Sequence, residues 1–493
     1  MSVVLSLKEF LKLSKQGNVI PVYKEVSADL DTPVSAFLKL ASSDYAFLLE
    51  SVEGQEKIAR YSFLGSSPEF IFKSKGKNIE EINLKNNTHK RFVTKLTPLD
   101  ELKKIMQHFK PVHLKSLPRF YGGLVGYMGY DVVRFFEEIS DKNLDDLNLP
   151  DCVFILTDTI LIFDHVNHTI KIVANLILPQ KSISLAQKTR IYNAAVKKIE
   201  AIQKELGKPL SEKETQYRPL KFKIASNFAK KQFCDRINRA KKYIRQGDII
   251  QMVMSQRFEL KTNKKPFDIY RKLRSINPSP YMFFLKLKSV TLVGSSPEML
   301  VRSEDGVVQT RPIAGTRPRG KNEEEDAALA VELINDKKER AEHLMLVDLG
   351  RNDLGRVCIP GTVKVSEFMN VEKYSHVMHL VSEVSGKLNK RYDSYGVLKA
   401  SFPAGTVSGS PKIRAMEIID ELENLRRGPY AGCVGYFSFS NNMDTCITIR
   451  TIVIKGNTAY IQAGAGIVAD SVPAKEYNEC VNKAKALMEA VAN

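Results

Sequence analysis

Residues 336–355 read DKKERAEHLMLVDLGRNDLG, and the interpretation of the whole chain starts from this stretch. Asp336 can cap a helix, and Glu339 follows three residues later at the spacing of a capping box. Apolar residues then recur near helical spacing until Gly350, where the pattern predicts that the helix ends. The stretch therefore predicts a helix that carries Glu339 and Glu342 on one face, one turn apart.

A second pair of glutamates, Glu476 and Glu479, has the same spacing and follows another helix-start pattern at residues 471–473. Four carboxylates on two helix ends suit a hard cation such as Mg²⁺, which prefers oxygen ligands and an anionic substrate. Simpler roles stay open at this point, because Glu339 can be a capping residue and Glu479 can pair with Lys483 at i+4.

The composition is that of a globular protein with a large core. The chain has 493 residues, of which 43% are hydrophobic and 26% charged, and its formal net charge is +18. Such a charge suits anionic partners. However, the lysines are spread along the chain without the aromatic interleaving of a nucleic-acid surface, so we expect no nucleic-acid partner.

The cysteines and the N-terminal residues favour a cytoplasmic location. None of the six cysteines forms a CxxC motif, which favours reduced thiols in a cytoplasmic protein. The N-terminal residues 1–13 are interrupted by Lys8 and Glu9 and do not resemble a signal peptide. No apolar run approaches membrane-spanning length, so no membrane partner is expected.

The order of apolar runs predicts many strands in two halves. Helices are expected within residues 1–13 and at 33–40, 99–109, 182–205, 230–246, 266–276 and 322–347. Strands are expected at 19–26, 45–51, 61–64, 69–74, 152–156, 159–163, 169–178, 247–260, 281–288, 289–301, 378–388, 433–440, 445–454 and 458–463, and a Gly-rich strand pair at 121–130. Residues 206–222 are polar and contain proline, and they form the best candidate linker.

Two motifs recur in the same order in both halves. GSSPE occurs at residues 65–69 and 294–298, and YGGLVGY at 121–127 is echoed by YAGCVGY at 430–436. We interpret this as an ancient duplication that gave two related, strand-rich halves. Chance similarity between turn-rich segments stays open as the alternative to a duplication, because the repeated motifs are unequally spaced in the two halves.

Several segments after residue 300 favour anion binding. Residues 311–320 (RPIAGTRPRG) form a predicted basic loop, residues 402–412 (FPAGTVSGSPK) a small-residue loop that leads into a helix, and residues 462–470 (QAGAGIVAD) a glycine-containing turn. Each taken alone is more simply a turn. The third segment lacks the strand–GxGxxG–helix frame of a dinucleotide site, and the chain has no Walker A, GxSxG or HExxH motif.

Taken together, the motifs PIAGTRPRG, EHLMLVDLGRNDLG, PAGTVSGSPK, RGPYAGCVGY and AGAGIVADSVPAKEYNE closely resemble those of the chorismate-utilising enzymes, and specifically the large subunits of anthranilate synthases. The resemblance is strong over residues 227–493 and looser before them. It implies an α+β fold, a large composite of two facing antiparallel β-sheets with helices outside. It also implies an N-terminal regulatory, tryptophan-binding region at 1–222 and a chorismate-binding catalytic region at 223–493.

The resemblance assigns roles to matched positions. Glu342 and Glu479 are the implied Mg²⁺ ligands, supported by Glu339 and Glu476. His379 is the implied acid/base group near the departing 4-hydroxyl. The other implied chorismate contacts are Gly315 and Thr316 along the ring, Thr406, Tyr430 and Arg450 at the enolpyruvyl carboxylate, and Gly464, Ala465 and Gly466 at the ring carboxylate.

Two positions choose among related reactions. Relatives that add water resemble this chain but have a lysine at the position of Gln251. Relatives that aminate the para position typically have a lysine at the position of Ala314. The expected reaction is therefore direct attack of ammonia at C2, giving anthranilate and pyruvate as the first step of tryptophan biosynthesis, with 4-amino-4-deoxychorismate synthase component I as the alternative.

The chain has no GxCxGxQ nucleophile elbow, so a separate glutamine amidotransferase subunit is implied as the source of ammonia. The resemblance further suggests feedback inhibition by tryptophan. The implied inhibitor-binding residues are Ser51, Pro280, Tyr281 and Met282, with Val434, Gly435 and Tyr436 nearby. Ordinary turns and core strands are the alternative for these segments.

Overall fold

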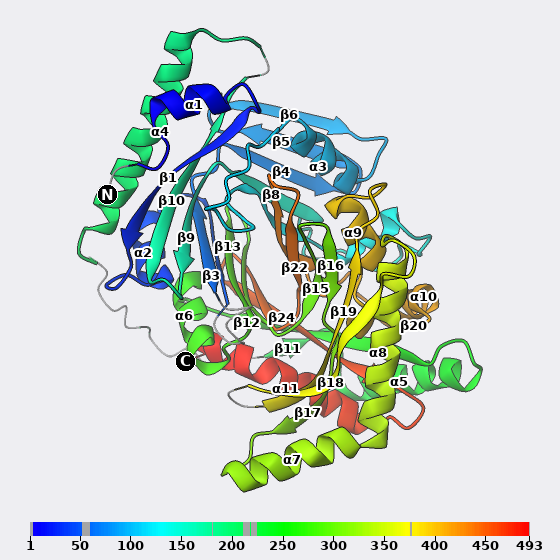
Figure 1. Ribbon diagram of the computed structural model, residues 1–493. Coiled ribbons are helices and arrows are strands. Elements are labelled where there is room, and N and C mark those ends of the chain that lie inside the picture. Colours follow the sequence, from blue (N-terminus) through cyan, green and yellow to red (C-terminus); the bar gives the residue numbers. More distant parts are fainter. Residues whose placement is uncertain are drawn as a thin grey trace.

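The computed structural model describes residues 3–51, 60–179, 181–210, 217, 224–374 and 377–492. Two large antiparallel sheets face each other, and helices lie on the outside (Figure 1). The predicted fold class is thereby confirmed. Side chains from both halves of the chain, including Phe47, Tyr127, Phe283 and Phe437, fill the space between the sheets as one apolar core.

The first sheet has the spatial order β1-β10-β9-β3-β2-β13-β14-β23-β24-β12-β11, and β20 pairs with β12. Its strands are β1 (Val19–Ser27), β2 (Tyr45–Glu50), β3 (Tyr61–Ser66), β9 (Thr159–Asp164), β10 (Thr169–Ile177), β11 (Ala225–Ser226), β12 (Gln251–Lys261), β13 (Tyr281–Leu287), β14 (Thr291–Ser296), β20 (Gly409–Ser410), β23 (Thr451–Lys455) and β24 (Thr458–Ile467).

The second sheet has the order β17-β19-β16-β15-β22-β21-β7-β8-β4-β5-β6, and β18 pairs with β19. Its strands are β4 (Phe70–Lys75), β5 (Asn78–Asn83), β6 (Thr88–Val93), β7 (Gly123–Met128), β8 (Cys152–Thr157), β15 (Met299–Glu304), β16 (Val307–Thr310), β17 (Ile313–Pro318), β18 (Lys364–Lys373), β19 (Val377–Lys387), β21 (Cys433–Ser438) and β22 (Met443–Ile447).

The helices lie mainly on the outer faces of the sheets (Figure 1). They are α1 (Leu7–Leu13), α2 (Pro33–Leu40), α3 (Pro98–Gln107), α4 (Leu185–Leu206), α5 (Lys230–Arg245), α6 (Pro266–Ile276), α7 (Glu323–Asn335), α8 (Lys337–Gly355), α9 (Ser394–Ser401), α10 (Lys412–Leu422) and α11 (Pro473–Ala492), with 3₁₀ turns η1 (Tyr130–Phe135) and η2 (Gly405–Val407). Residues of α1, α2, α4, α6 and α11 form a second apolar core against the first sheet. In the described part of the chain, no helix combines the length and apolarity needed to cross a membrane.

The two halves have the same strand order, as the duplication hypothesis requires. In the first sheet β1-β10-β9-β3-β2 matches β12-β24-β23-β14-β13, and in the second β7-β8-β4-β5 matches β21-β22-β15-β16. The repeated glycines also have equivalent neighbours: a Cβ on Gly65 would lie 2.2 Å from the ring of Phe47, and one on Gly294 would lie 2.0 Å from the ring of Phe283. The halves join through the pairs β2–β13 and β7–β21, so both halves build both sheets.

Several local predictions were wrong. The segments 289–301 and 445–454, each predicted as one strand, are both divided between the two sheets, as β14 and β15 and as β22 and β23. The strand pair predicted at 121–130 is the single strand β7 followed by η1, and most of the turn predicted at 462–470 belongs to β24. The helix that starts at Asp336 does not end at Gly350 but runs to Gly355, because the missing side chain of Gly350 allows close packing against Thr310. The single helix predicted for residues 322–347 is two helices, α7 and α8, which separate at the capping residue Asp336. The predicted loop at 311–320 contains the edge strand β17, whose register shifts at Gly315, where φ is +58°.

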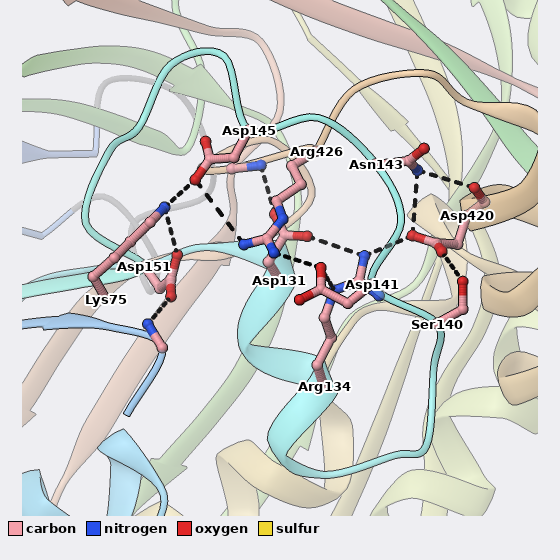
Figure 2. A network of polar contacts seen from close by, with 12 residues as sticks. Lys75, Asp131, Arg134, Ser140, Asp141, Asn143, Asp145, Asp151, Asp420 and Arg426 are labelled. Carbon is pink, nitrogen blue, oxygen red and sulfur yellow. Dashed lines mark hydrogen bonds and ion pairs between the residues drawn. The ribbon is translucent and has the colours of Figure 1, made fainter. Parts of the chain in front are cut away.

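The predicted linker at 206–222 begins where α4 ends, and its residues 211–216 and 218–222 lie outside the described residues. Contact between the halves is instead visible in a polar network at residues 131–151 (Figure 2). There Arg134 Nη2 lies 2.6 Å from Asp420 Oδ1 of α10, and Asn143 Nδ2 donates to the Asp420 carbonyl at 3.0 Å. The acidic segment of the first half is thus anchored to the catalytic half predicted from the sequence.

Candidate active site

A cavity of about 790 Å³ lies where α8, α11, β12, β17 and β24 come together. The predicted residues that line it are Gly315, Thr316, Glu339, Glu342, His379, Thr406, Tyr430, Arg450, Gly464, Gly466, Glu476 and Glu479. Ala465 differs, because its side chain is fully buried in an apolar cluster with Met254 and Ile418. The fold thus brings segments as far apart in sequence as Gln251 and Lys483 to one cavity.

The four glutamates share this cavity but do not form a closed cluster. In the described part of the chain, no group of three His, Cys, Asp or Glu side chains is close enough to hold a metal as it stands. Burial and the neighbouring Glu342 raise the pKa of Glu339, and burial with repulsion from Glu479 raises the pKa of Glu476, where a Ser471 hydrogen bond opposes the shift. A divalent cation would relieve this repulsion, so the donor set fits Mg²⁺.

Both implied metal ligands have partners in the structure. Glu342 Oε1 accepts a hydrogen bond from Gln251 Nε2 at 3.2 Å. Glu479 Oε1 lies 2.7 Å from Lys483 Nζ, which is the i+4 pair that the sequence left open. Since exposed pairs of this kind contribute only about 0.3–0.5 kcal/mol, Lys483 does not prevent Glu479 from turning to a cation.

Arg450 is a half-buried cation that lines the cavity and, within the described residues, has no acidic partner. Its Nη1 donates to the Lys483 carbonyl at 3.0 Å, and within the described residues no carboxylate lies at ion-pair distance from it. Burial lowers its pKa, although Tyr430 and Glu479 act in the opposite direction. An unpaired guanidinium beside the Tyr430 hydroxyl is suited to bind the carboxylate of a ligand.

The proton on His379 can be placed from its neighbours. His379 Nδ1 lies 3.0 Å from the Gly315 carbonyl oxygen, which can only accept, so Nδ1 carries the proton and Nε2 keeps its lone pair. Thr316 Oγ1 lies 3.1 Å from the same nitrogen. Burial lowers the pKa of His379, so the imidazole is neutral near pH 7 and is a base or acceptor rather than an acid.

Glu298 is a cavity residue to which the sequence interpretation gave no role. It follows β14, it is 7% exposed, and burial raises the pKa of its carboxyl to about 8, against the opposing effects of Thr406 and Lys483. A carboxyl with this pKa is protonated at neutral pH and can donate a proton. The sequence did contain a feature that singles out Glu298, because this residue ends one of the two GSSPE repeats.

Gln251 and Ala314 also line the cavity. The amide nitrogen of Gln251 must face Glu342, because a carboxylate only accepts. Its Oε1 is buried and has no hydrogen-bond partner within the described residues. The oxygen of the Gln251 amide is thus an acceptor without a protein donor within the described residues. Neither Gln251 nor Ala314 supplies a lysine or another strong base to the cavity wall.

The predicted inhibitor residues Ser51, Pro280, Tyr281 and Met282 line a second, smaller pocket between the sheets. One side of the pocket is a charged cluster in which Arg302 lies 2.8 Å from Asp444 and the Tyr281 hydroxyl donates to Asp444 at 3.1 Å. Ser51 Oγ is buried and has no partner within the described residues. The pocket offers apolar walls with a few polar groups, as small-molecule sites do.

Comparison with known proteins gives three concordant findings. A family model described as chorismate binding enzyme matches residues 78–489. Anthranilate synthase component 1 from Acetivibrio thermocellus is 49% identical, covering 99% of this chain and 98% of that protein, and the same component from Aquifex aeolicus is 50% identical, covering 100% and 98%. The crystal structure of anthranilate synthase component I from Streptococcus pneumoniae has a TM-score of 0.78 at 37% identity and covers 94% of this chain and 98% of that one.

Proposed function

The chain belongs to the chorismate-binding enzymes, and we propose that it is the large subunit of an anthranilate synthase, a Mg²⁺-dependent lyase of tryptophan biosynthesis that converts chorismate and ammonia to anthranilate and pyruvate. One observation carries the proposal. A single cavity is lined by the half-buried Arg450, which has no acidic partner within the described residues, by two pairs of glutamates, and by Glu298, whose pKa burial raises to about 8. These groups match a substrate with two carboxylates and a leaving hydroxyl.

The two carboxylates of chorismate use different parts of the cavity. Arg450 and the Tyr430 hydroxyl hold the enolpyruvyl carboxylate by charge-assisted hydrogen bonds. The backbone of Gly464 and Gly466 receives the ring carboxylate. Glu342 and Glu479 would hold Mg²⁺ there, with Glu339 and Glu476 behind them, and the bound ion supplies positive charge that stabilises the ring carboxylate as electrons shift.

Glu298 and His379 divide the proton transfers between them because their environments move their pKa values in opposite directions. The neutral carboxyl of Glu298 donates a proton to the 4-hydroxyl, which departs as water while the nitrogen of ammonia bonds to C2. The neutral His379 has a free Nε2 lone pair to accept a hydrogen bond or a proton. Loss of the C2 proton with transfer of a proton to the departing enolpyruvyl group then gives anthranilate and pyruvate.

Gln251 favours ammonia over water as the nucleophile. The amide of Gln251 cannot deprotonate water, so this position does not activate water as a nucleophile. The chain therefore uses ammonium alone, and glutamine only with a glutamine amidotransferase subunit; the component numbering of its relatives supports a partner. The six free cysteines support a cytoplasmic location.

We propose the second pocket as the site of feedback inhibition by tryptophan. Pro280, Met282 and Tyr281 provide apolar surface for an indole ring, and Ser51 Oγ provides an unused polar atom for the amino-acid group. The regulatory region at 1–222 contributes β2 to this pocket, while β13 and β21 come from the catalytic region at 223–493.

The test is to incubate the purified chain with chorismate, ammonium and Mg²⁺ and to follow anthranilate fluorescence. We expect fluorescence with ammonium, none with glutamine alone, and inhibition by tryptophan. Isochorismate, salicylate or 4-amino-4-deoxychorismate as the product would overturn the proposed reaction. If the chain alone used glutamine, the proposal of a separate glutamine amidotransferase subunit would be refuted.

A further inference from the structure

A buried ion pair lies directly behind the wall of the active-site cavity. Arg427 and Glu423 are 3% and 5% exposed. Arg427 Nε donates to Glu423 Oε2 at 2.9 Å, and Nη2 donates to Oε1 at 2.7 Å, which is a two-pronged contact. Neither residue lines the cavity, so the pair has no place in the proton transfers described above.

The remaining donors of Arg427 hold two segments that do line the cavity. Nη1 donates to the carbonyl of Val407 at 2.7 Å, next to Thr406 in η2. Nη2 donates to the carbonyl of Val253 in β12 at 2.8 Å. Because each contact is made to the main chain, Arg427 fixes the path of η2 and β12 rather than one side chain.

Glu423 connects the ion pair to β24 through Ser255 of β12. Its Oε1 accepts hydrogen bonds from the amide of Ser255 at 2.9 Å and from its hydroxyl at 2.7 Å. Ser255 Oγ in turn accepts from Gln462 Nε2 at 2.8 Å, and Gln462 lines the cavity. The pair therefore connects β12, β24 and η2 at one point.

The guanidinium of Arg427 also lies between two tyrosine rings. Its carbon is 4.8 Å from the ring centre of Tyr130 and 5.5 Å from that of Tyr430. Tyr430 has little room to move, because a Cβ on Gly464 would lie 2.7 Å from its hydroxyl. Its ring orientation is thus set by Arg427 on one side and by β24 on the other.

The segment that carries these residues is anchored from outside by the first half of the chain. Arg426 points away from the cavity into the network of Figure 2, where it pairs with Asp141. The amide of Gly428 donates to Asp131 Oδ2 at 2.9 Å. Neighbouring arginines therefore face opposite ways, one toward the first half and one toward the cavity wall.

We propose that Arg427, held by Glu423, is a positioning residue for chorismate: it sets the Tyr430 hydroxyl and the main chain of η2 and β12 in the geometry that the substrate requires. This inference rests on the proposed function of the cavity. A purely stabilising role predicts that chorismate affinity falls only together with melting temperature and tryptophan affinity, whereas a positioning role predicts a loss confined to chorismate.

That difference supplies the test. The double variant Arg427→Met/Glu423→Leu removes both charges together, so no buried charge is left unpaired, and it removes the hydrogen bonds that the pair makes with Val407, Val253 and Ser255. We expect it to fold, to bind tryptophan as the wild type does, and to show a chorismate KM raised about tenfold or more with a lower kcat, because small displacements of a binding geometry cost large factors in rate. The matched control is Arg414→Met/Glu417→Leu, an ion pair that is about 40% exposed on helix α10, which ends at Leu422 just before Glu423. This control should leave both constants unchanged.

Arg427→Lys provides the conservative comparison, because it keeps the charge but not the planar fork. It should fold and show an intermediate chorismate KM. A double variant with wild-type chorismate KM and kcat would overturn the inference, and so would parallel losses of tryptophan affinity, melting temperature and chorismate affinity in both Arg427 variants. A wild-type protein that makes no anthranilate would instead refute the proposed function, which separates the two failures.

Discussion

At the scale of single residues, the two GSSPE repeats end in glutamates with very different surroundings. Glu69 ends the first copy at the surface and forms an ion pair with Lys85 at 2.9 Å. Glu298 ends the second copy inside the cavity, where burial raises its pKa to about 8. The sequence displays the repeat but not the difference, since burial at residue 298 depends on η2 and α8, which come later in the chain.

Replacing Glu298 with glutamine should lower kcat by about 10²–10⁴-fold, because the amide has no acidic proton to give to the leaving hydroxyl. In the wild type the protonated form is complete well below pH 8 and is lost as the pH rises through about 8, so activity should fall on that alkaline limb. A pH–rate profile checks both points. If Glu298→Gln had wild-type activity, or if the wild-type rate did not fall near pH 8, Glu298 would not be the proton donor to the leaving hydroxyl. The surface counterpart Glu69→Gln is the matched control.

Ser51 allows a prediction at the same scale for the second pocket. Ser51→Leu removes the unused hydroxyl and fills space beside Met282, so the tryptophan concentration for half inhibition should rise by about tenfold or more. The measurement is anthranilate formation against tryptophan concentration, normalised to the rate without tryptophan. Inhibition equal to that of the wild type would place the inhibitor elsewhere.

At the scale of elements, helix starts were predictable and sheet edges were not. Asp336 caps α8 through the amides of Lys338 and Glu339, as local chemistry predicts. The strands β5, β6, β11, β16, β17, β18 and β20 were not predicted. The edge strand β6 was missed because it is polar and exposed on both faces and lacks an alternating pattern. The interior strand β16 has only four residues, and β11 and β20 have only two each. The end of α8 was not predicted for a different reason: Gly350 lies inside the helix, where a Cβ would come within 3.0 Å of Thr310, a contact that the local sequence does not show.

The helices α8 and α11 should act together in metal binding. Glu342→Gln and Glu479→Gln should each raise the Mg²⁺ concentration for half-maximal activity by about tenfold or more, whereas Glu324→Gln on the exposed face of α7 should not. Mg²⁺ affinity should also weaken as the pH falls, since Glu339 and Glu476 hold protons to higher pH than ordinary carboxyls. Activity titrated with Mg²⁺ measures both effects. Unchanged dependence in both glutamine variants would contradict the shared site.

At the scale of the whole molecule, the duplicated halves complete each other. The motif echoes predicted two related halves, and the resemblance predicted two facing sheets, but neither showed that each sheet would take strands from both halves. That arrangement depends on the pairs β2–β13 and β7–β21, which join residues 45–50 to 282–287 and 123–128 to 433–438. Pairings at such separation leave no local signal in the sequence.

It follows that neither half should fold alone. Separately expressed fragments 1–222 and 223–493 expose the edges of β2 and β13 and the shared core, and we expect them to aggregate or to melt without cooperativity. Co-expression should restore a soluble complex with activity. Thermal melting followed by circular dichroism is the measurement, and a cooperative transition from an isolated fragment would show that the halves are independent domains.

The central claim is that this cavity aminates chorismate at C2, and mass-resolved product analysis with ¹⁵N-labelled ammonium tests it most directly. The account predicts anthranilate that carries one ¹⁵N atom, formed with an equal amount of pyruvate and only when Mg²⁺ is present. Formation of labelled 4-amino-4-deoxychorismate, or of an unlabelled isochorismate or salicylate, would contradict it.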